Sequence, residues 1–139
     1  MNKLVSQIKR HEGIKLKPYL CSEKKITIGY GRNLSDVGIS VSEAEEFLRS
    51  DILLATKSLL NSFPWMAKLN DARASVCINM TFNLGLRGFK KFVKTISAIE
   101  SHDFDLAAFE MMDSKWAQQI GESRATELAE QMRTGKWED

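Results

Sequence analysis

The segment HEGIKLKPYLCSEKKITIGYGR, residues 11–32, carries three side chains whose types and spacing could do chemistry. A carboxyl, Glu12, is followed after eight residues by a thiol, Cys21, and after five more by a hydroxyl, Thr27. Glycoside hydrolysis needs an acid on one side of the scissile bond and a base or nucleophile on the other. Glu12 and Cys21 could flank such a bond while Thr27 orients a water. A Glu at a helix end is usually a solvated surface residue, however, so spacing alone leaves this chemistry open.

The first element that must position these groups is a helix over residues 2–12. Its apolar residues fall on one side, and Gly13 is suited to end it. Glu12 then lies at the C-terminal end of the helix, where partial negative charge disfavours a second anion. That position favours the protonated carboxyl that a general acid requires. The apolar residues of this helix are Leu4, Val5 and Ile8.

A strand or hairpin is predicted from Lys24 to Arg32, and it is the only convincing strand region of the sequence. Three larger apolar residues alternate there with Thr27 and two glycines, which is the period-two pattern of a half-buried strand. The face with Thr27, Gly29 and Gly31 has a hydroxyl and little bulk, so a sugar ring could approach it. Cys21 falls in the turn before this strand.

The remainder of the chain is predicted to be helical. Ser42 and Glu45 have the spacing of a capping box that opens a long helix, and FPW at 63–65 ends it. A central helix begins near Asn70 and stops at Gly85. Further helices are expected at about 88–101, at 103–116 with Asp103 as N-cap, and at 123–133. A small sheet near the start of a mostly helical chain predicts an α+β protein with two unequal lobes and a cleft between them.

The composition sets bounds on the class of protein. The chain has 139 residues, enough for one domain with a real core, and a net charge of +2, too small to indicate a nucleic-acid binder. We expect Cys21 and Cys77 to be reduced thiols, since two cysteines make no disulfide framework. The N-terminus lacks the apolar core of a signal peptide, and no stretch reaches the length of a membrane helix. We therefore expect a protein made in a cytoplasm and not inserted in a membrane.

The spacing of Glu12, Cys21 and Thr27 resembles the Glu-(x8)-Asp/Cys-(x5)-Thr triad of the T4 lysozyme-like phage endolysins, glycoside hydrolase family 24. The resemblance covers nearly the whole chain in order, and the short segment between Arg32 and Ser40 makes the chain a compact member. Cys21 stands where the family most often has Asp. The other matching segments are TIGYGR (27–32), VSEAEEFLRSD (41–51), INMTFNLG (78–85), SKW (114–116), Arg124 and RTGKW (133–137).

The resemblance implies a role for each matched residue. Glu12 corresponds to the general acid, Cys21 to the residue of the second catalytic position, and Thr27 to the residue that holds the attacking water. Arg124 corresponds to an arginine that approaches the catalytic Glu. The matched positions of the cleft, which would contact substrate, are Asn33 in the small lobe and Phe82, Asn83 and Thr95 in the large lobe.

Three further expectations concern packing. Arg32 corresponds to a residue that pairs with an acid at the position of Asp51, which would link the strand region to the long helix. Trp116 and Trp137 have apolar neighbours and are expected in the core. His11 adjoins Glu12, but neighbours on a helix point about 100° apart, so His11 is expected in solvent.

The fold and function implied by the resemblance are those of a lysozyme. The small lobe would comprise residues 13–60, including the long connecting helix, and the large lobe residues 1–12 and 61–139. The enzyme would be a monomeric muramidase that hydrolyses the β-1,4 bond between N-acetylmuramic acid and N-acetylglucosamine in peptidoglycan. It would wait in the host cytoplasm until a holin opens the membrane. No metal or organic cofactor is implied, since the sequence has no His cluster and no glycine-rich phosphate loop.

Two alternatives on the same fold remain open. The chain could be a peptidoglycan-binding protein in which Cys21 marks lost catalysis. It could also be a lytic transglycosylase, which needs only the Glu because a hydroxyl of the sugar itself attacks. A small helical nucleic-acid binder is a more distant alternative, given the nearly neutral charge.

Overall fold

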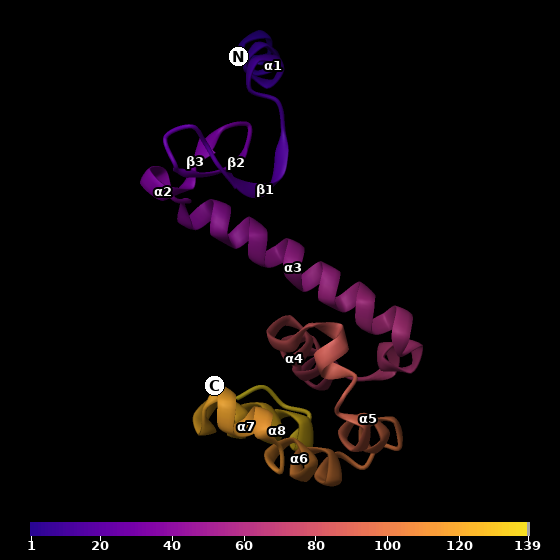
Figure 1. Cartoon of the computed structure of the whole chain (residues 1–139). Helices are drawn as coiled ribbons and strands as arrows, with labels where there is room; N and C mark the ends of the chain where they lie inside the picture. Colours follow the sequence, from indigo (N-terminus) through magenta and orange to yellow (C-terminus); the bar gives the residue numbers. More distant parts are fainter. Residues whose placement is uncertain (139) are drawn as a thin grey trace. The chain divides into compact units, whose positions relative to one another are not determined.

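The computed structural model describes residues 1–138 and divides the chain into two compact units, Met1–Phe47 and Leu48–Asp139 (Figure 1). A three-stranded antiparallel sheet lies in the first unit, and the second unit is helical. The predicted α+β, lysozyme-like class is therefore confirmed. Helix α3, Val41–Ser62, crosses the boundary between the units.

The first unit begins with α1, Asn2–Glu12, which has the bounds that the sequence predicts. Gly13 ends this helix at a φ of 68°, a left-handed conformation that favours glycine, and its N–H bonds to the Lys9 carbonyl at 3.0 Å. Leu4, Val5 and Ile8 of α1 are all exposed. The helix therefore presents an apolar side that its own unit does not cover.

The sheet of the first unit has the order β1-β2-β3, with strands Lys15–Leu20, Ile26–Gly29 and Arg32–Asn33. Thr27 lies opposite Tyr19 on one side and Asn33 on the other. The short helix α2, Leu34–Val37, follows β3 directly. The sequence prediction of a strand region at 24–32 is confirmed in β2, but it missed β1 and α2.

The second unit contains the rest of α3 and the chain after it. The 3-10 helix η1 begins at Pro64, where the FPW segment was expected to end the long helix. The kink at Gly85, φ 76°, falls where the central helix was predicted to stop. The elements after α3 are η1 (Pro64–Lys68), α4 (Asp71–Phe89), α5 (Val93–Glu100), α6 (Phe104–Met112), α7 (Lys115–Ile120) and α8 (Glu122–Thr134).

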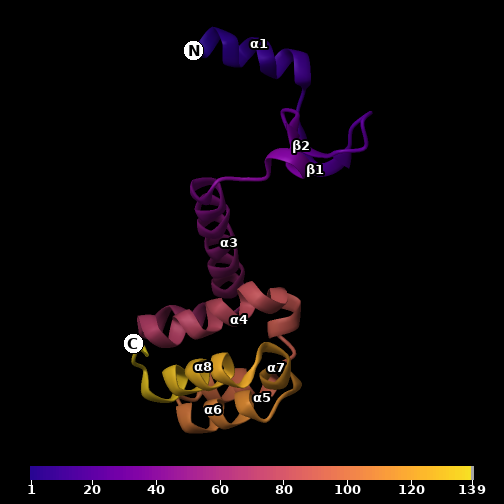
Figure 2. The same cartoon turned by 90° about the vertical axis from the view of Figure 1, so that its left-hand side faces the viewer.

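Within this unit, α8 lies between α4 and α6 and contacts both (Figure 2). The largest fully buried side chains of the chain all belong to the helices of this unit. An edge-to-face aromatic contact joins Phe92 to Trp116, which confirms the prediction that Trp116 is in the core. The same prediction for Trp137 is wrong, because Trp137 follows the end of α8 and is 60% exposed.

Three predictions about the helices need correction. The helix predicted at about 88–101 is α5, Val93–Glu100, because α4 continues past the kink at Gly85 to Phe89. The capping box of α3 is formed by Ser40 and Glu43, not by Ser42 and Glu45: the Ser40 hydroxyl accepts from the Glu43 N–H at 3.1 Å, and the Glu43 carboxylate accepts from the Ser40 N–H at 2.9 Å. The predicted helix 103–116 is two helices, because Ser114 caps a new one with its hydroxyl. Asp103 is an N-cap as predicted.

Among residues 1–138, no helix combines the length and the apolar character needed to cross a membrane.

Candidate active site

Glu12, the predicted acid, lies at the last residue of α1 against the turn between β2 and β3. A Cβ built on Gly31 would stand 3.1 Å from Glu12 Oε2 and 3.4 Å from its carboxyl carbon. Gly31 has a φ of 84°, which favours glycine, so the turn both bends sharply and leaves room for the carboxyl. The Lys9 ammonium lies 5.3 Å from the centre of the Tyr30 ring, a cation–π contact that joins α1 to the same turn.

Cys21 lies in the turn between β1 and β2, where backbone N–H groups face its sulfur. Hydrogen bonds from the backbone of Lys25 and then of Glu23 lower the pKa of the Cys21 thiol below its ordinary value, and the Thr27 hydroxyl adds to this effect. Partial desolvation and the Glu23 carboxylate act in the opposite direction. The turn itself is closed by the Cys21 N–H, which donates to the Lys25 carbonyl at 3.0 Å. The loop therefore stabilises a negative charge at position 21.

Thr27 is the one buried side chain among residues 1–47, with 4% of its surface exposed. Its hydroxyl donates to the Lys25 carbonyl at 2.9 Å. This hydrogen bond fixes the direction of the Thr27 hydroxyl within the small sheet. The predicted alternation is not reproduced in the burial of β2, because Thr27 is buried, Ile26 is 48% exposed, and Ile28 and Gly29 are both half-buried. The prediction that a sugar ring could approach the face with Thr27 is therefore wrong at Thr27 itself.

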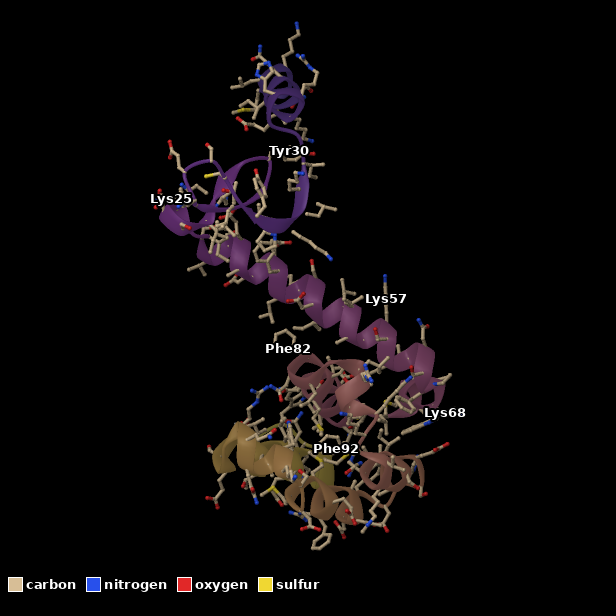
Figure 3. All side chains as sticks on the ribbon, viewed as in Figure 1. Lys25, Tyr30, Lys57, Lys68, Phe82 and Phe92 are labelled. Carbon is tan, nitrogen blue, oxygen red and sulfur yellow. The ribbon has the colours of Figure 1, made fainter. Side chains whose placement is uncertain are left out.

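The structure brings Cys21 and Thr27 together at one end of β2 and places Glu12 at the other end. Figure 3 marks both ends, with Lys25 on the Cys21 side and Tyr30 on the Glu12 side. The sheet register agrees, because Leu20 pairs with Ile26 and Lys15 with Gly29. The acid and the thiol–hydroxyl pair therefore lie at opposite ends of one hairpin.

Arg32 has a different partner from the one predicted. Its guanidinium pairs with Glu43 at 2.7 Å and donates to the Gly38 carbonyl at 2.9 Å. The prediction that Arg32 pairs with Asp51 is wrong in its partner. The capping box explains the difference, since it fixes the Glu43 carboxylate at the start of α3 next to the end of the sheet.

Asn33, a predicted substrate contact, is the N-cap of α2. Its side-chain oxygen accepts from the Asp36 N–H at 3.1 Å, and its amide nitrogen donates to the Asp36 carboxylate at 2.9 Å. Both ends of the amide are thus engaged within the protein. Sequence reasoning missed this role, although the spacing Asn33 to Asp36 is the spacing of a helix N-cap and could have indicated it.

The remaining predicted site residues lie in the second unit and differ in exposure. Phe82 is 47% exposed. The Asn83 side chain accepts from the Trp116 indole N–H at 3.2 Å, and the Arg124 guanidinium donates to the Asn79 side chain at 2.7 Å. Thr95 is only 2% exposed on the inner side of α5, which leaves its side chain no surface to offer to a sugar.

Each unit has a groove near predicted site residues. In the first unit a groove of about 910 Å³ follows the residues from Ile28 to Asn33 and continues to Phe47, so it includes Gly31, the neighbour of Glu12. In the second unit a groove of about 480 Å³ is lined by Phe82, Arg124 and Trp137 among others. Both combine apolar walls with a few polar groups, which is typical of binding sites for small molecules and sugars.

Within the described part of the chain, no three His, Cys, Asp or Glu side chains lie close enough to hold a metal ion together. Cys77, in the core of the second unit, is 1% exposed, and burial raises the pKa of its thiol to about 12. The two cysteines are both free, and only Cys21 has a loop that favours the thiolate.

Comparison with known proteins identifies the family of the chain. The family model described as "Phage lysozyme" matches residues 9–133. An endolysin of Acyrthosiphon pisum secondary endosymbiont phage 1 is 33% identical over 125 residues, which cover 87% of this chain and 82% of that protein. A probable T4-type lysozyme 1 of Dictyostelium discoideum is 26% identical, with 97% of this chain and 96% of that protein covered. The chain belongs to the phage lysozyme family of lysozyme-type glycosidases.

Proposed function

We propose that this chain is a muramidase that cleaves the β-1,4 bond between N-acetylmuramic acid and N-acetylglucosamine in bacterial peptidoglycan. The observation that carries the proposal is the arrangement of one hairpin. The Glu12 carboxyl lies against Gly31 at one end, and Cys21 with Thr27 lies at the other. Family membership supplies the reaction class, and the similarity to an endolysin supports peptidoglycan as the polymer.

In this proposal Glu12 donates its proton to the glycosidic oxygen as the bond to the sugar carbon breaks. A water held by Thr27 attacks that carbon, and its proton passes to the Cys21 thiolate. The backbone N–H groups of Lys25 and Glu23 support the second role, because they stabilise the negative charge of the thiolate before the water arrives.

Cys21 can replace the usual Asp for a physical reason. An unperturbed thiol is only a few per cent ionised at neutral pH, so it is a poorer fixed charge than a carboxylate. The backbone donors of the turn reduce this handicap by lowering the pKa of the thiol. The lowered pKa supports an active residue at position 21 more than it supports a relic of lost catalysis.

Arg124 and the cleft residues complete the proposal in the second unit. We propose that Arg124 approaches Glu12 and that Phe82 and Asn83 contact the glycan. The exposed ring of Phe82 and the groove that it shares with Arg124 support these assignments. Double-mutant cycles between Arg124→Gln and Glu12→Gln, read as kcat/KM, test the first of them. Independent effects would remove Arg124 from the site.

We also propose that residues 1–12 belong to the large lobe with residues 61–139. The support is apolar surface left exposed in each unit: Leu4 and Ile8 on α1, and Phe82 with Trp137 in the groove of the second unit. Ile8→Ala should then lower the urea midpoint of the whole chain. An unchanged midpoint would leave α1 outside the large lobe.

The biological setting is part of the same proposal. The protein would act as a monomer, remain in the host cytoplasm, and reach the wall when a holin opens the membrane, so that the cell lyses. Expression in bacteria with and without an inducible holin tests this, because lysis should need both proteins. Lysis without the holin would contradict the dependence.

The bond cleaved is tested by digesting purified peptidoglycan and analysing the released muropeptides by mass spectrometry. A muramidase leaves reducing N-acetylmuramic acid ends. Anhydro-muramic ends would instead indicate a lytic transglycosylase, in which a hydroxyl of the sugar replaces the water. Binding without any released fragment would indicate a binding protein on the same fold.

A further inference from the structure

The short helix α2 is hydrogen-bonded to the two residues that separate the Cys21 turn from Thr27. The Ser35 hydroxyl accepts from the Ile26 N–H at 2.8 Å. The Asp36 carboxylate accepts from the Lys25 ammonium at 3.1 Å. Lys25 is labelled in Figure 3, beside α2. Two consecutive residues of α2 are thus attached to two consecutive residues of the chain that leads into β2.

The backbone of Lys25 is the centre of the Cys21–Thr27 pair. Its carbonyl accepts from the Cys21 N–H at 3.0 Å and from the Thr27 hydroxyl at 2.9 Å. Its N–H is the first of the groups that stabilise the Cys21 thiolate. Any rotation of this peptide would therefore disturb the thiol, the hydroxyl and the turn together.

The bond to the Lys25 carbonyl also decides what Thr27 can do. A threonine hydroxyl has one proton and two lone pairs. While that proton is donated to the carbonyl, the oxygen can only accept, as from a water beside it, and the hydroxyl can donate to the Cys21 thiolate only when it turns away from the carbonyl. A water that donates to Thr27 keeps a lone pair free to attack, so the direction of the Lys25 carbonyl orients the nucleophile.

Helix α2 is itself fixed from the sheet. Asn33, which pairs with Thr27 in the sheet, caps the helix and also donates to the Asp36 carboxylate at 2.9 Å. Asp36 therefore holds the Lys25 side chain from a position that Asn33 sets. This closed path runs from Asn33 in the sheet through Asp36 of α2 and back to Lys25, two residues before Thr27.

We propose that Ser35 and Asp36 are positioning residues for the Cys21–Thr27 pair, acting through the backbone of Lys25 and Ile26. The catalytic consequence rests on the proposed muramidase function, whereas the effect on the thiol does not. Neither residue needs to touch substrate. The Lys25 and Asp36 side chains are 39% and 53% exposed, so their ion pair contributes little to global stability and its loss should be felt locally.

The direct test measures the rate at which iodoacetamide alkylates Cys21 in the full-length protein as a function of pH. Buried Cys77 should stay silent, and peptide mass spectrometry confirms the modified site. Ser35→Ala should raise the midpoint of the titration and slow alkylation at neutral pH at least about threefold, which corresponds to half a pKa unit. Ser35→Thr, which keeps the hydroxyl, should restore the wild-type midpoint.

Ser40→Ala is the matched control, since it also removes a serine hydroxyl from a backbone N–H at a helix start in the same unit. Its midpoint should equal that of the wild type. An unchanged midpoint in Ser35→Ala, or an equal shift in Ser40→Ala, would overturn the proposal. Lys25→Met tests the same effect through the ion pair with Asp36, and Lys24→Met is its control because it also removes one lysine charge. Lys25→Met should raise the midpoint of the Cys21 titration more than Lys24→Met does.

Asp36→Ala separates positioning from simple charge. The charged groups that face the thiol environment are Glu23, which raises the pKa of Cys21, and the Lys25 ammonium held by Asp36. Removing a carboxylate would by charge alone lower the pKa of the thiol. Positioning predicts the opposite, a rise in the midpoint, so a fall would contradict it.

Activity distinguishes this proposal from the proposed function. Ser35→Ala should lower kcat on peptidoglycan with little change in KM, because the residue does not touch the glycan. If wild-type protein cleaves no glycan while the thiol midpoint still responds to Ser35→Ala, the proposed function fails and the positioning stands. If the wild type is active and the midpoint does not respond, the positioning fails alone.

Discussion

The two units of the chain are built in different ways. Every buried side chain of the described residues except Thr27 lies in the unit Leu48–Asp139, where Phe89, Met80 and Ile99 are fully covered. The unit Met1–Phe47 is held instead by caps, turns and ion pairs, such as Asn33 with Asp36 and Arg32 with Glu43. The three candidate catalytic residues, Glu12, Cys21 and Thr27, all lie in the unit Met1–Phe47.

The difference indicates how stability and chemistry are divided. Apolar burial of about 25 cal/mol per Å² is the main driving force of folding, so the helical unit should dominate the free energy of unfolding. Hydrogen bonds add little net stability but fix directions, which is what an acid, a thiol and a hydroxyl require. Truncation of buried side chains in the helical unit should therefore cause the largest losses of stability, and changes at Glu12, Cys21 or Thr27 the largest losses of activity.

The largest expected effect is on the core. Phe89→Ala should lower the free energy of unfolding by about 3–5 kcal/mol, because it leaves a cavity at a side chain with no exposed surface. Urea unfolding followed by circular dichroism measures it. Leu16→Ala, at an 80% exposed position of β1, is the control and should change stability by less than about 0.5 kcal/mol. Similar losses at both positions would remove the contrast between the units.

The second effect should appear in activity without any change in fold. Glu12→Gln keeps the shape of the side chain but removes the proton to be transferred, so turnover should fall by at least about 10²-fold. The urea midpoint should stay at the wild-type value. Glu122→Gln, at an exposed position of α8, should keep full turnover. A Glu12→Gln protein that clears cells at the wild-type rate would exclude Glu12 as the acid.

A smaller effect separates the observed cap of α3 from the predicted one. Ser40→Ala should cost about 1 kcal/mol, since the Ser40 hydroxyl accepts from the Glu43 N–H. Ser42→Ala, at the position that the sequence suggested, should cost less than half of that. Thermal unfolding of the two variants under one condition decides between them. A larger loss of stability in Ser42→Ala than in Ser40→Ala would instead identify Ser42 as the cap of α3.

The smallest effect is a pH dependence in the first unit. The Ser40 backbone N–H and hydroxyl, followed by Arg32, lower the pKa of the Glu43 carboxyl. A carboxyl with a lowered folded pKa contributes stability that is complete above its unfolded pKa and is lost as pH falls through the folded value. The wild-type Tm should therefore drop in acid slightly more than the Tm of Glu43→Gln. If the Tm of the wild type and the Tm of Glu43→Gln fall equally with decreasing pH, ionised Glu43 contributes nothing to stability.

The features that the sequence predicted well are those set by a local signal such as a glycine or a capping residue. The ends of α1, the kink at Gly85 and the cap at Asp103 follow from residues a few positions apart. The elements it missed, β1 and α2, are short and are held by partners distant in sequence, such as Ile26 with Ser35. Trp137 was misplaced because apolar neighbours in sequence do not establish a neighbour in space.

In the candidate site, too, the sequence predicted the residues but not the contacts that depend on the folded backbone. The spacing of Glu12, Cys21 and Thr27 singled out these three residues, because a family motif records the spacing directly, but it did not predict the strand β1 that precedes Cys21. The backbone donors around Cys21 could not be predicted, since they depend on the φ and ψ angles of the turn, including a φ of 60° at Lys24. The partner of Arg32 was missed for the same reason, because the box of Ser40 and Glu43 places the carboxylate.

The most direct test of the account is the pH profile of turnover on purified peptidoglycan for wild type, Cys21→Asp and Cys21→Ala. The account predicts that wild-type activity rises with pH as the thiolate forms, beginning below the ordinary pKa of a thiol, until Glu12 loses the proton that it must donate. Cys21→Asp should stay active and lose that rise, while Cys21→Ala should lose most activity at every pH. A Cys21→Ala protein that hydrolyses peptidoglycan at the wild-type rate would contradict the account.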